Sequence, residues 1–517
     1  MTPQDLQVLF EQGRHREVLD QFAQLETQGK FTLLRENEQI ECLYYKSRAL
    51  ERLERYDEAL QVATEARQTF PSPSNKSLTL ALLCAQCFAL FNSGRYDEVL
   101  KLIVEVDAIF KTLTAKEHQS ESNWVALFYH IKGSAHWTEG EPDRALDYCQ
   151  RSLALYEALG NSYDIAVILH TMGHIYSAKD EVETALEYYQ RSLDLCEEIG
   201  NLVGTAISLM NIGYLYFNNG ELATALDYLQ RSVVVSEELG YLYITTAALT
   251  HISSIYWYKG ELATALEYLQ RSLALSKGIF QKDVSDFMMA GSLFRLIMVT
   301  LDQEDHIQAQ SYLKELQQIQ KRASDKWIDF FSLLAEALVL KRSSRMKHKA
   351  QAQTILEQLI GEVKKLFWIH FFLHTLVTVH LCDLLLFEVK STGELDVWEK
   401  VKTLIQQLYT QAQDRQSVVI MCEVLLLQAK FAAIDGDLQQ AQNYLDQAKV
   451  SAKEKALGLL SQKITVEQQR FEAEFEKWRA LIQRNAPLQE RVDHARLQDY
   501  LHDVQKFVKV MDARRKD

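Results

Sequence analysis

Apolar and small residues recur at helical spacing along most of the chain, and residues 209–233 show the pattern clearly. In the first half of this stretch, Leu209, Ile212 and Tyr216 fall on one helical face, which predicts a helix. We expect that helix to end at Gly220, because glycine readily adopts the left-handed conformation that follows a helix. A second helix is predicted from Glu221, with one face made by Ala225, Leu226, Leu229, Ser232 and Val233.

The same two-helix pattern returns every forty residues. The second helix of each pair starts with one of four related stretches: GEPDRALDYCQRSL (140–153), DEVETALEYYQRSL (180–193), GELATALDYLQRSV (220–233) and GELATALEYLQRSL (260–273). Self-similarity at a fixed period predicts a stacked repeat architecture. Small residues hold fixed places in each copy, namely Gly133, Gly173, Gly213 and Ser253 in the first helix, then Ala145, Ala185, Ala225 and Ala265 in the second. We expect them to let paired helices cross closely.

Weaker copies extend the array in both directions and predict about eleven helix pairs, with 366–412 the least regular part. The last segment, 462–515, predicts two helices without the repeat signature, as expected of a terminal cap that covers the final apolar face. The predicted division is 1–120 for divergent N-terminal repeats, 121–280 for regular repeats, 281–455 for divergent C-terminal repeats and 456–517 for capping helices.

These motifs resemble the tetratricopeptide repeat (TPR). The spacing, together with Leu159-Gly160-Asn161 and Ile199-Gly200-Asn201 between units, is most similar to the Leu-Gly-Asn subclass. That subclass occurs in spindle-orientation adaptors, kinesin light chains and prokaryotic regulators. The resemblance implies an all-α fold, a right-handed superhelical solenoid of antiparallel helix pairs with a C-terminal helical cap.

The resemblance also implies that the first helix of each pair lines a concave groove that binds a partner. The groove positions predicted here are Phe88, Phe91, His130, Trp137, His170, His174, Met210, Tyr214, Phe217, Asn218, Thr250, Trp257, Tyr258 and Phe294. This set is aromatic and nearly uncharged, which is typical of binding surfaces; the alternative is that these side chains pack against neighbouring helices. The family's carboxylate clamp for chaperone tails uses Lys, Asn and Arg at these places, so its absence argues against a chaperone-tail cochaperone.

Charge and cysteine content narrow the class of protein. The net charge of −14 argues against a general nucleic-acid binder, because phosphate contacts need a basic surface. The 7 cysteines are odd in number and scattered, which predicts reduced, buried residues and a cytoplasmic location. The N-terminus is amphipathic and acidic, unlike a secretory signal. The apolar stretch 366–387 has the length of a membrane span, but its three histidines and Asp383 favour a buried helix.

No catalytic or metal-binding motif stands out. His170 and His174 share a helix face, as do His370 and His374, but no further ligand completes either pair, so no metal and no cofactor are expected. Cys84 and Cys87 have redox spacing in an apolar helix, which favours packing. The basic run 341–349 predicts a solvated turn, or else a site for an acidic partner.

The sequence therefore predicts a non-enzymatic scaffold or adaptor that binds a peptide segment of a partner protein, extended or amphipathic and helical, in a TPR groove. The alternative is a regulator that senses a peptide or small ligand and changes conformation to control an effector protein. No nucleic acid is expected as a partner, and no membrane span is expected.

Overall fold

The protein is described by a computed structural model of the 517-residue chain. The structure describes residues 2–495 and Leu497, apart from 54, 72–75, 94, 115–121, 180, 219–220, 280–281, 324, 364–370, 415–417 and 455–457.

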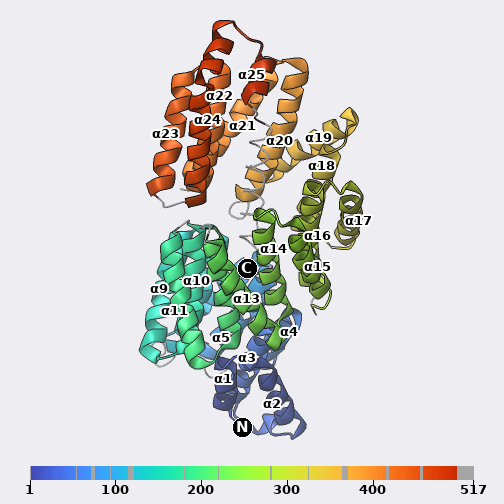
Figure 1. Cartoon of the computed structure of the whole chain (residues 1–517). Coiled ribbons are helices and arrows are strands. Elements are labelled where there is room, and N and C mark those ends of the chain that lie inside the picture. Colours follow the sequence, from blue (N-terminus) through green and yellow to red (C-terminus); the bar gives the residue numbers. More distant parts are fainter. Residues whose placement is uncertain are drawn as a thin grey trace. The chain divides into compact units, whose positions relative to one another are not determined.

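The described residues form α-helices joined by short turns, with one 3-10 turn and no strand (Figure 1). The helices are α1 (Pro3–Glu11), α2 (His15–Thr27), η1 (Phe31–Leu33), α3 (Glu36–Arg52), α4 (Tyr56–Thr69), α5 (Lys76–Asn92), α6 (Tyr96–Phe110), α8 (Ser122–Thr138), α9 (Pro142–Leu159), α10 (Ser162–Ala178), α11 (Val182–Ile199), α12 (Leu202–Asn218), α13 (Leu222–Leu239), α14 (Leu242–Tyr258), α15 (Leu262–Ser276), α16 (Lys282–Asp302), α17 (His306–Arg322), α18 (Lys326–Lys341), α19 (Met346–Val363), α20 (Phe371–Thr392), α21 (Leu395–Asp414), α22 (Val418–Asp435), α23 (Leu438–Glu454), α24 (Gly458–Gln483) and α25 (Leu488–Ala495). The predicted all-α array of helix pairs is confirmed.

The helix pairs form where the sequence predicts them, because small residues remove the side chains that would hold the helices apart. A Cβ atom at Gly133 would lie 2.9 Å from the Cys149 sulfur, and one at Gly173 would lie 2.7 Å from the Tyr189 ring. Each is closer than real Cβ contacts allow, so glycine is required for the observed crossing. The repeated alanines of the second helices are fully buried, namely Ala145, Ala185, Ala225 and Ala265.

The turns between paired helices also follow the prediction at two of the three turn glycines. Gly140 and Gly260 adopt φ of 80° and 81°, in the left-handed region that glycine enters without strain. Gly220 lies outside the described residues.

The serine of the repeated Gln-Arg-Ser motif has a structural role that the sequence did not reveal. Its hydroxyl donates to a backbone carbonyl of the preceding helix, from Ser152 to Ala126 (2.8 Å), from Ser192 to Ala166 (2.8 Å) and from Ser232 to Ala206 (2.7 Å). The repeated second helix is therefore locked to its partner by both packing and a buried hydrogen bond.

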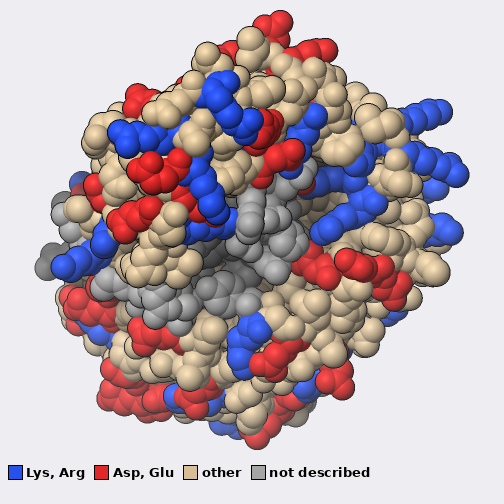
Figure 2. Space-filling view, turned by 45° about the horizontal axis from the view of Figure 1, so that its top comes forward, with Lys and Arg blue, Asp and Glu red and all other residues tan. Residues whose placement is uncertain are grey.

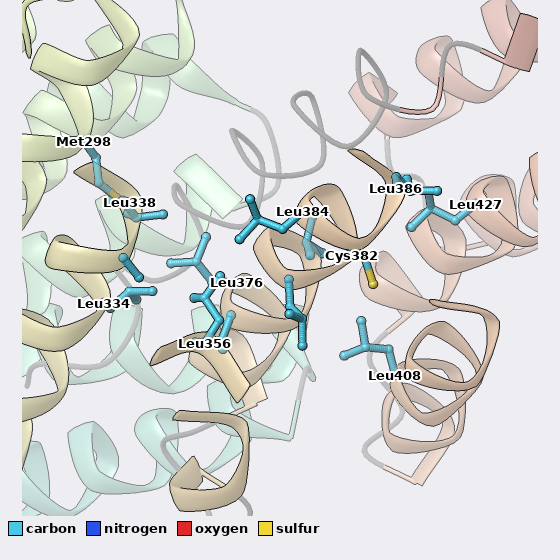
Figure 3. Close-up of a cluster of buried hydrophobic side chains, with 14 of the residues drawn as sticks. Met298, Leu334, Leu338, Leu356, Leu376, Cys382, Leu384, Leu386, Leu408 and Leu427 are labelled. Carbon is cyan, nitrogen blue, oxygen red and sulfur yellow. The ribbon is translucent and has the colours of Figure 1, made fainter. Parts of the chain in front are cut away.

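The chain forms two compact units. Unit 1 consists of Met1–Leu215, Asp227–Ala248 and Leu275–Ser285; unit 2 consists of Tyr216–Leu226, Leu249–Ala274 and Asp286–Asp517. Unit 2 has one continuous apolar core, and Figure 3 shows the part in which side chains of α16, α18, α19, α20, α21 and α22 meet, including Met298, Leu338, Leu376 and Leu427. The four repeat classes predicted from the sequence remain a prediction.

One described helix segment, Val284–Asp302, is long and apolar enough to cross a membrane, and 89% of its apolar window is buried inside the protein. Its burial is that of a core helix. The stretch 366–387 lies partly outside the described residues; in its described part His374 and His380 are buried, at 4% and 3% exposure.

Two smaller predictions have different outcomes. All seven cysteines are free and buried, as expected. The basic run 341–349 does include the turn between α18 and α19, but Lys341 is not solvated. Its ammonium forms an ion pair with Asp383 and lies 3.0 Å from Nδ1 of His380, with only 12% of the side chain exposed. On the face drawn in Figure 2, basic and acidic side chains are interspersed.

Candidate functional site

A connected set of polar and aromatic side chains lies on successive first helices of unit 1. We call this set the inner row and define it as Phe88 (α5), His130 (α8), His170, Thr171 and His174 (α10) and Asn211 (α12). The forty-residue period brings these side chains together, because each helix places the same face beside that of the helix one repeat later.

Contacts between neighbouring members run along the row. The rings of Phe88 and His130 have centroids 5.0 Å apart. Nε2 of His130 lies 3.5 Å from the Thr171 hydroxyl. The Asn211 amide nitrogen lies 3.4 Å from Nε2 of both His170 and His174. These polar contacts are longer than ordinary hydrogen bonds and therefore weak.

The histidines of the row are neutral at neutral pH. Burial, followed by the charges of Arg48 and Arg52, lowers the pKa of His130 to about 3. Burial alone lowers the pKa of His174 to about 4. The pKa of His170 is also lowered, mainly by burial and then by His174 and Arg52. A neutral imidazole has one donor and one acceptor nitrogen, so the row can offer both kinds of hydrogen bond.

One end of the row meets a charged cluster on α3. The Arg48 guanidinium lies over the Phe88 ring at 4.0 Å from its centroid. Glu51 lies 3.2 Å from Nη1 of Arg48 and 3.6 Å from Nε of Arg52. Arg48 and Glu51 are each only 3% exposed, so this ion pair is held away from water. The cluster explains the positive field felt by His130.

The N-terminal helix pair packs on a distant repeat of the same unit. Phe10 at the end of α1 contacts the rings of both Tyr45 and Tyr163, with centroids 5.8 Å and 5.3 Å away. Tyr163 belongs to the first turn of α10, so the first helix pair packs on a repeat far along the sequence. Unit 1 is thereby closed on itself at this point.

The predicted groove residues divide into three groups. Eight are buried: Phe88, His130, Met210, Tyr214, Phe217, Thr250, Trp257 and Phe294. Four are half-buried: Phe91, Trp137, His170 and His174. Two side chains, Asn218 and Tyr258, lie outside the described ones. The indole of Trp257 donates a 2.9 Å hydrogen bond to Asp302, which gives that residue a part in the packing of unit 2.

Sequence reasoning missed Arg48, Glu51, Arg52 and Asn211. Counting the groove positions back from residue 54, which stands where the regular repeats have their turn glycine, puts Arg48 and Arg52 at the ninth and thirteenth positions. Residue 54 is glutamate, so the marker used for the count was absent. Asn211 lies next to a predicted groove position, Met210, and only the structure shows it between two histidines.

The inner row has no arrangement that indicates catalysis or metal binding. The cysteines of the redox-like pair are buried in α5, and burial raises the pKa of Cys87 to about 12, which makes its thiol a poor nucleophile. Among the residues that the structure describes, one group of three His, Cys or carboxylate ligands lies close enough to hold an ion. It consists of His136, Glu139 and Glu141, outside the inner row.

Comparison with known families agrees with this architecture. The family model of the MalT-like TPR region matches residues 128–456, which is more than half of the chain. The protein belongs to this TPR family. The matched range includes α10 and α12, which carry four of the six inner-row residues.

Solved structures also match this TPR protein, at low sequence identity. The apo form of RapI is 14% identical, with a TM-score of 0.50 and coverage of 72% of this chain and 98% of that chain. The apo quorum sensor NprR from B. thuringiensis is 14% identical, with a TM-score of 0.49 and coverage of 69% and 97%. TPR-like repeats of a kinesin light chain from Podosopora anserina are 15% identical, with a TM-score of 0.31 and coverage of 38% and 96%. No curated protein matches the sequence.

Proposed function

We propose that this TPR protein is a non-enzymatic, cytoplasmic scaffold that binds a peptide segment of a partner protein along the inner row. The proposal rests on one observation. Neutral hydrogen-bonding side chains on α8, α10 and α12 form a continuous row, and the polar contacts between them are long, at 3.4–3.5 Å. Such weak contacts are readily exchanged for shorter ones to a ligand.

The chemistry of the row fits a peptide better than an ion. A peptide backbone presents alternating N–H and C=O groups, and neutral imidazole, hydroxyl and amide groups can satisfy both. The half-buried Trp137 on α8 adds aromatic surface, which is favoured in peptide grooves. The half-buried members are His170, Thr171 and His174, all on α10, and they form the centre of the proposed site.

The experiment that tests this proposal is selection of random linear peptides on the full-length protein, followed by affinity measurement. The double variant His174→Ala/Asn211→Ala should bind the selected peptides about tenfold or more weakly, because each lost hydrogen bond contributes about 1 kcal/mol. Gln190→Ala is the matched control, since Gln190 is exposed on the repeated helix α11. Failure to enrich any peptide, or equal affinity in the double variant, would reject the proposal.

A second candidate is a sensor whose ligand changes the conformation of unit 1. The contact between Phe10 and Tyr163 favours it, because a peptide that extends past α10 would compete with α1 for the same surface. Small-angle scattering with a selected peptide distinguishes the two functions. A change in the radius of gyration supports the sensor, whereas an unchanged radius with a bound peptide supports the scaffold.

A further inference from the structure

The turn between α8 and α9 differs chemically from the equivalent turns of the later repeats. In all three later regular repeats a tyrosine near the end of the first helix is followed by a glutamate five residues later, and in two of them a lysine lies between the two. Tyr176, Lys179 and Glu181 show this pattern in one repeat. At the turn after α8 the same places hold His136, Glu139 and Glu141, so a lysine has been replaced by an acid.

The turns after α10 and α14 are each closed by an ion pair beside an aromatic stack. Lys179 lies 3.1 Å from Glu181, and Tyr176 stacks on Tyr188 with centroids 5.2 Å apart. The turn after α14 repeats this geometry: Lys259 lies 2.6 Å from Glu261, and Tyr256 stacks on Tyr268. In both turns the lysine ammonium balances the charge of the glutamate.

The turn after α8 keeps the stack but reverses the charge. His136 stacks on Tyr148 at 5.2 Å with an interplanar angle of 8°. Its Nδ1 lies 3.1 Å from a carboxylate oxygen of Glu139 and 2.9 Å from one of Glu141. Two carboxylates and an imidazole nitrogen therefore lie close together at the place where the turns after α10 and α14 have an ammonium group. Arg144 pairs with Glu141 at 2.8 Å and compensates one of the two negative charges.

We propose that His136, Glu139 and Glu141 bind a divalent first-row transition-metal ion. The three ligand atoms lie within 4.8 Å of one another. Ligands held about 2.1 Å from one ion are about 3.0 Å apart in octahedral and about 3.4 Å apart in tetrahedral geometry, close to the distances from Nδ1 seen here. One imidazole with two carboxylates suits ions such as Zn²⁺, Co²⁺ and Mn²⁺.

The site is open to solvent and joins two helices. About 15% of the His136 side chain is exposed, against 43% for Glu139 and 41% for Glu141, so water can complete the coordination. An ion there would link the end of α8 to the start of α9, as the lysine links the two helices in the turns after α10 and α14.

The test uses the turns after α10 and α14 as templates. Isothermal titration of the full-length protein with ZnCl₂, and the visible absorption of added CoCl₂, should reveal one saturable site. Glu139→Lys introduces the lysine found in two later repeats, and His136→Tyr introduces the tyrosine found in all three, so both should fold, as circular dichroism will verify. Each should lower the affinity about 100-fold or more, exceeding the 10–100-fold typical of second-shell changes.

The reciprocal variant tests sufficiency. Tyr256→His/Lys259→Glu places the same three ligand types beside Glu261 and should add a second binding equivalent. His174→Ala should leave binding intact, because the His170–His174 pair is a separate candidate. Undiminished Zn²⁺ binding in Glu139→Lys, binding lost in His174→Ala, or no added equivalent in the reciprocal variant would overturn the proposal.

Discussion

The second helices α9, α11 and α13 and the first helices α8, α10 and α12 belong to the same repeats, yet they differ in what they keep constant. In the second helices, Ser152, Ser192 and Ser232 make the same hydrogen bond to the preceding helix, at 2.7–2.8 Å each. In the first helices, equivalent positions change from His130 and His170 to Met210. We call the constant positions, namely the repeated small residues and serines between paired helices, the frame. The variable positions of the first helices differ in chemistry from one repeat to the next.

The two sets of positions also differ in what they contribute to the stability of the folded protein. Frame residues are small or apolar and fully buried, so their packing stabilises the array. Inner-row residues such as His130 are polar and buried with long contacts, which is unfavourable for stability. A protein retains unfavourable polar groups where they serve recognition, so the contrast itself supports the proposed site.

The largest effect is expected from a change in the frame. Gly173→Leu would drive a side chain into the Tyr189 ring, 2.7 Å from the position of its Cβ, and should lower the free energy of unfolding by about 3 kcal/mol or more. Urea denaturation measures this loss. Gly361→Ala is the control, because no atom lies within 4 Å of its Cβ position, and it should be neutral or slightly stabilising. Equal stability of the two variants would show that close helix crossing is not what the repeat glycines provide.

Lowering the pH should destabilise the protein, because the buried His130 stays neutral in the folded state. The pKa of His130 is lowered to about 3, so the unfolded chain takes up a proton near pH 6.5 while the folded protein does not. Above pH 6.5 His130 is neutral in both the folded and the unfolded protein. As the pH falls below 6.5, protonation of the unfolded chain lowers the free energy of unfolding. Between pH 6.5 and 5 the loss is about 2 kcal/mol.

Denaturation of the wild type and of His130→Gln at several pH values measures the part of the pH dependence that comes from His130. The variant should lose less stability on acidification, whereas His306→Gln, at an exposed position, should follow the wild type. Asp164 acts in the opposite direction, since burial raises its pKa to about 6, but that contribution is common to all three proteins. Parallel pH profiles for the wild type and His130→Gln would contradict a neutral buried imidazole.

A moderate effect is expected from the serines of the frame. Ser152→Ala, Ser192→Ala and Ser232→Ala should each lower stability by about 1 kcal/mol, because each removes a buried hydrogen bond between paired helices. Thermal denaturation of the three single variants gives the comparison. Ser272, in the fourth copy, lies 3.1 Å from the Thr250 hydroxyl and 3.0 Å from that of Ser292. A wide spread among the first three variants would mean that their frames are not equivalent.

The frame could be predicted from the sequence because its causes are local. Helix faces, the turn at Gly140 and the close crossing at Gly133 all depend on residues within one repeat. The contact between α1 and α10 could not be predicted, because Phe10 and Tyr163 lie many repeats apart in the sequence. The charge reversal at Glu139 was visible in the sequence, but only the structure shows His136 between two carboxylates.

The smallest effect is expected on the exposed side of the repeated helix. Arg151 lies 2.8 Å from Asp147, but both side chains are more than half exposed, so water and salt weaken their attraction. Arg151→Ala should change the free energy of unfolding by no more than about 0.5 kcal/mol and leave peptide affinity unchanged. Urea denaturation and the peptide assay measure both quantities on one sample. A marked loss of peptide affinity would mean that the repeated second helices, and not the variable first helices, bind the peptide.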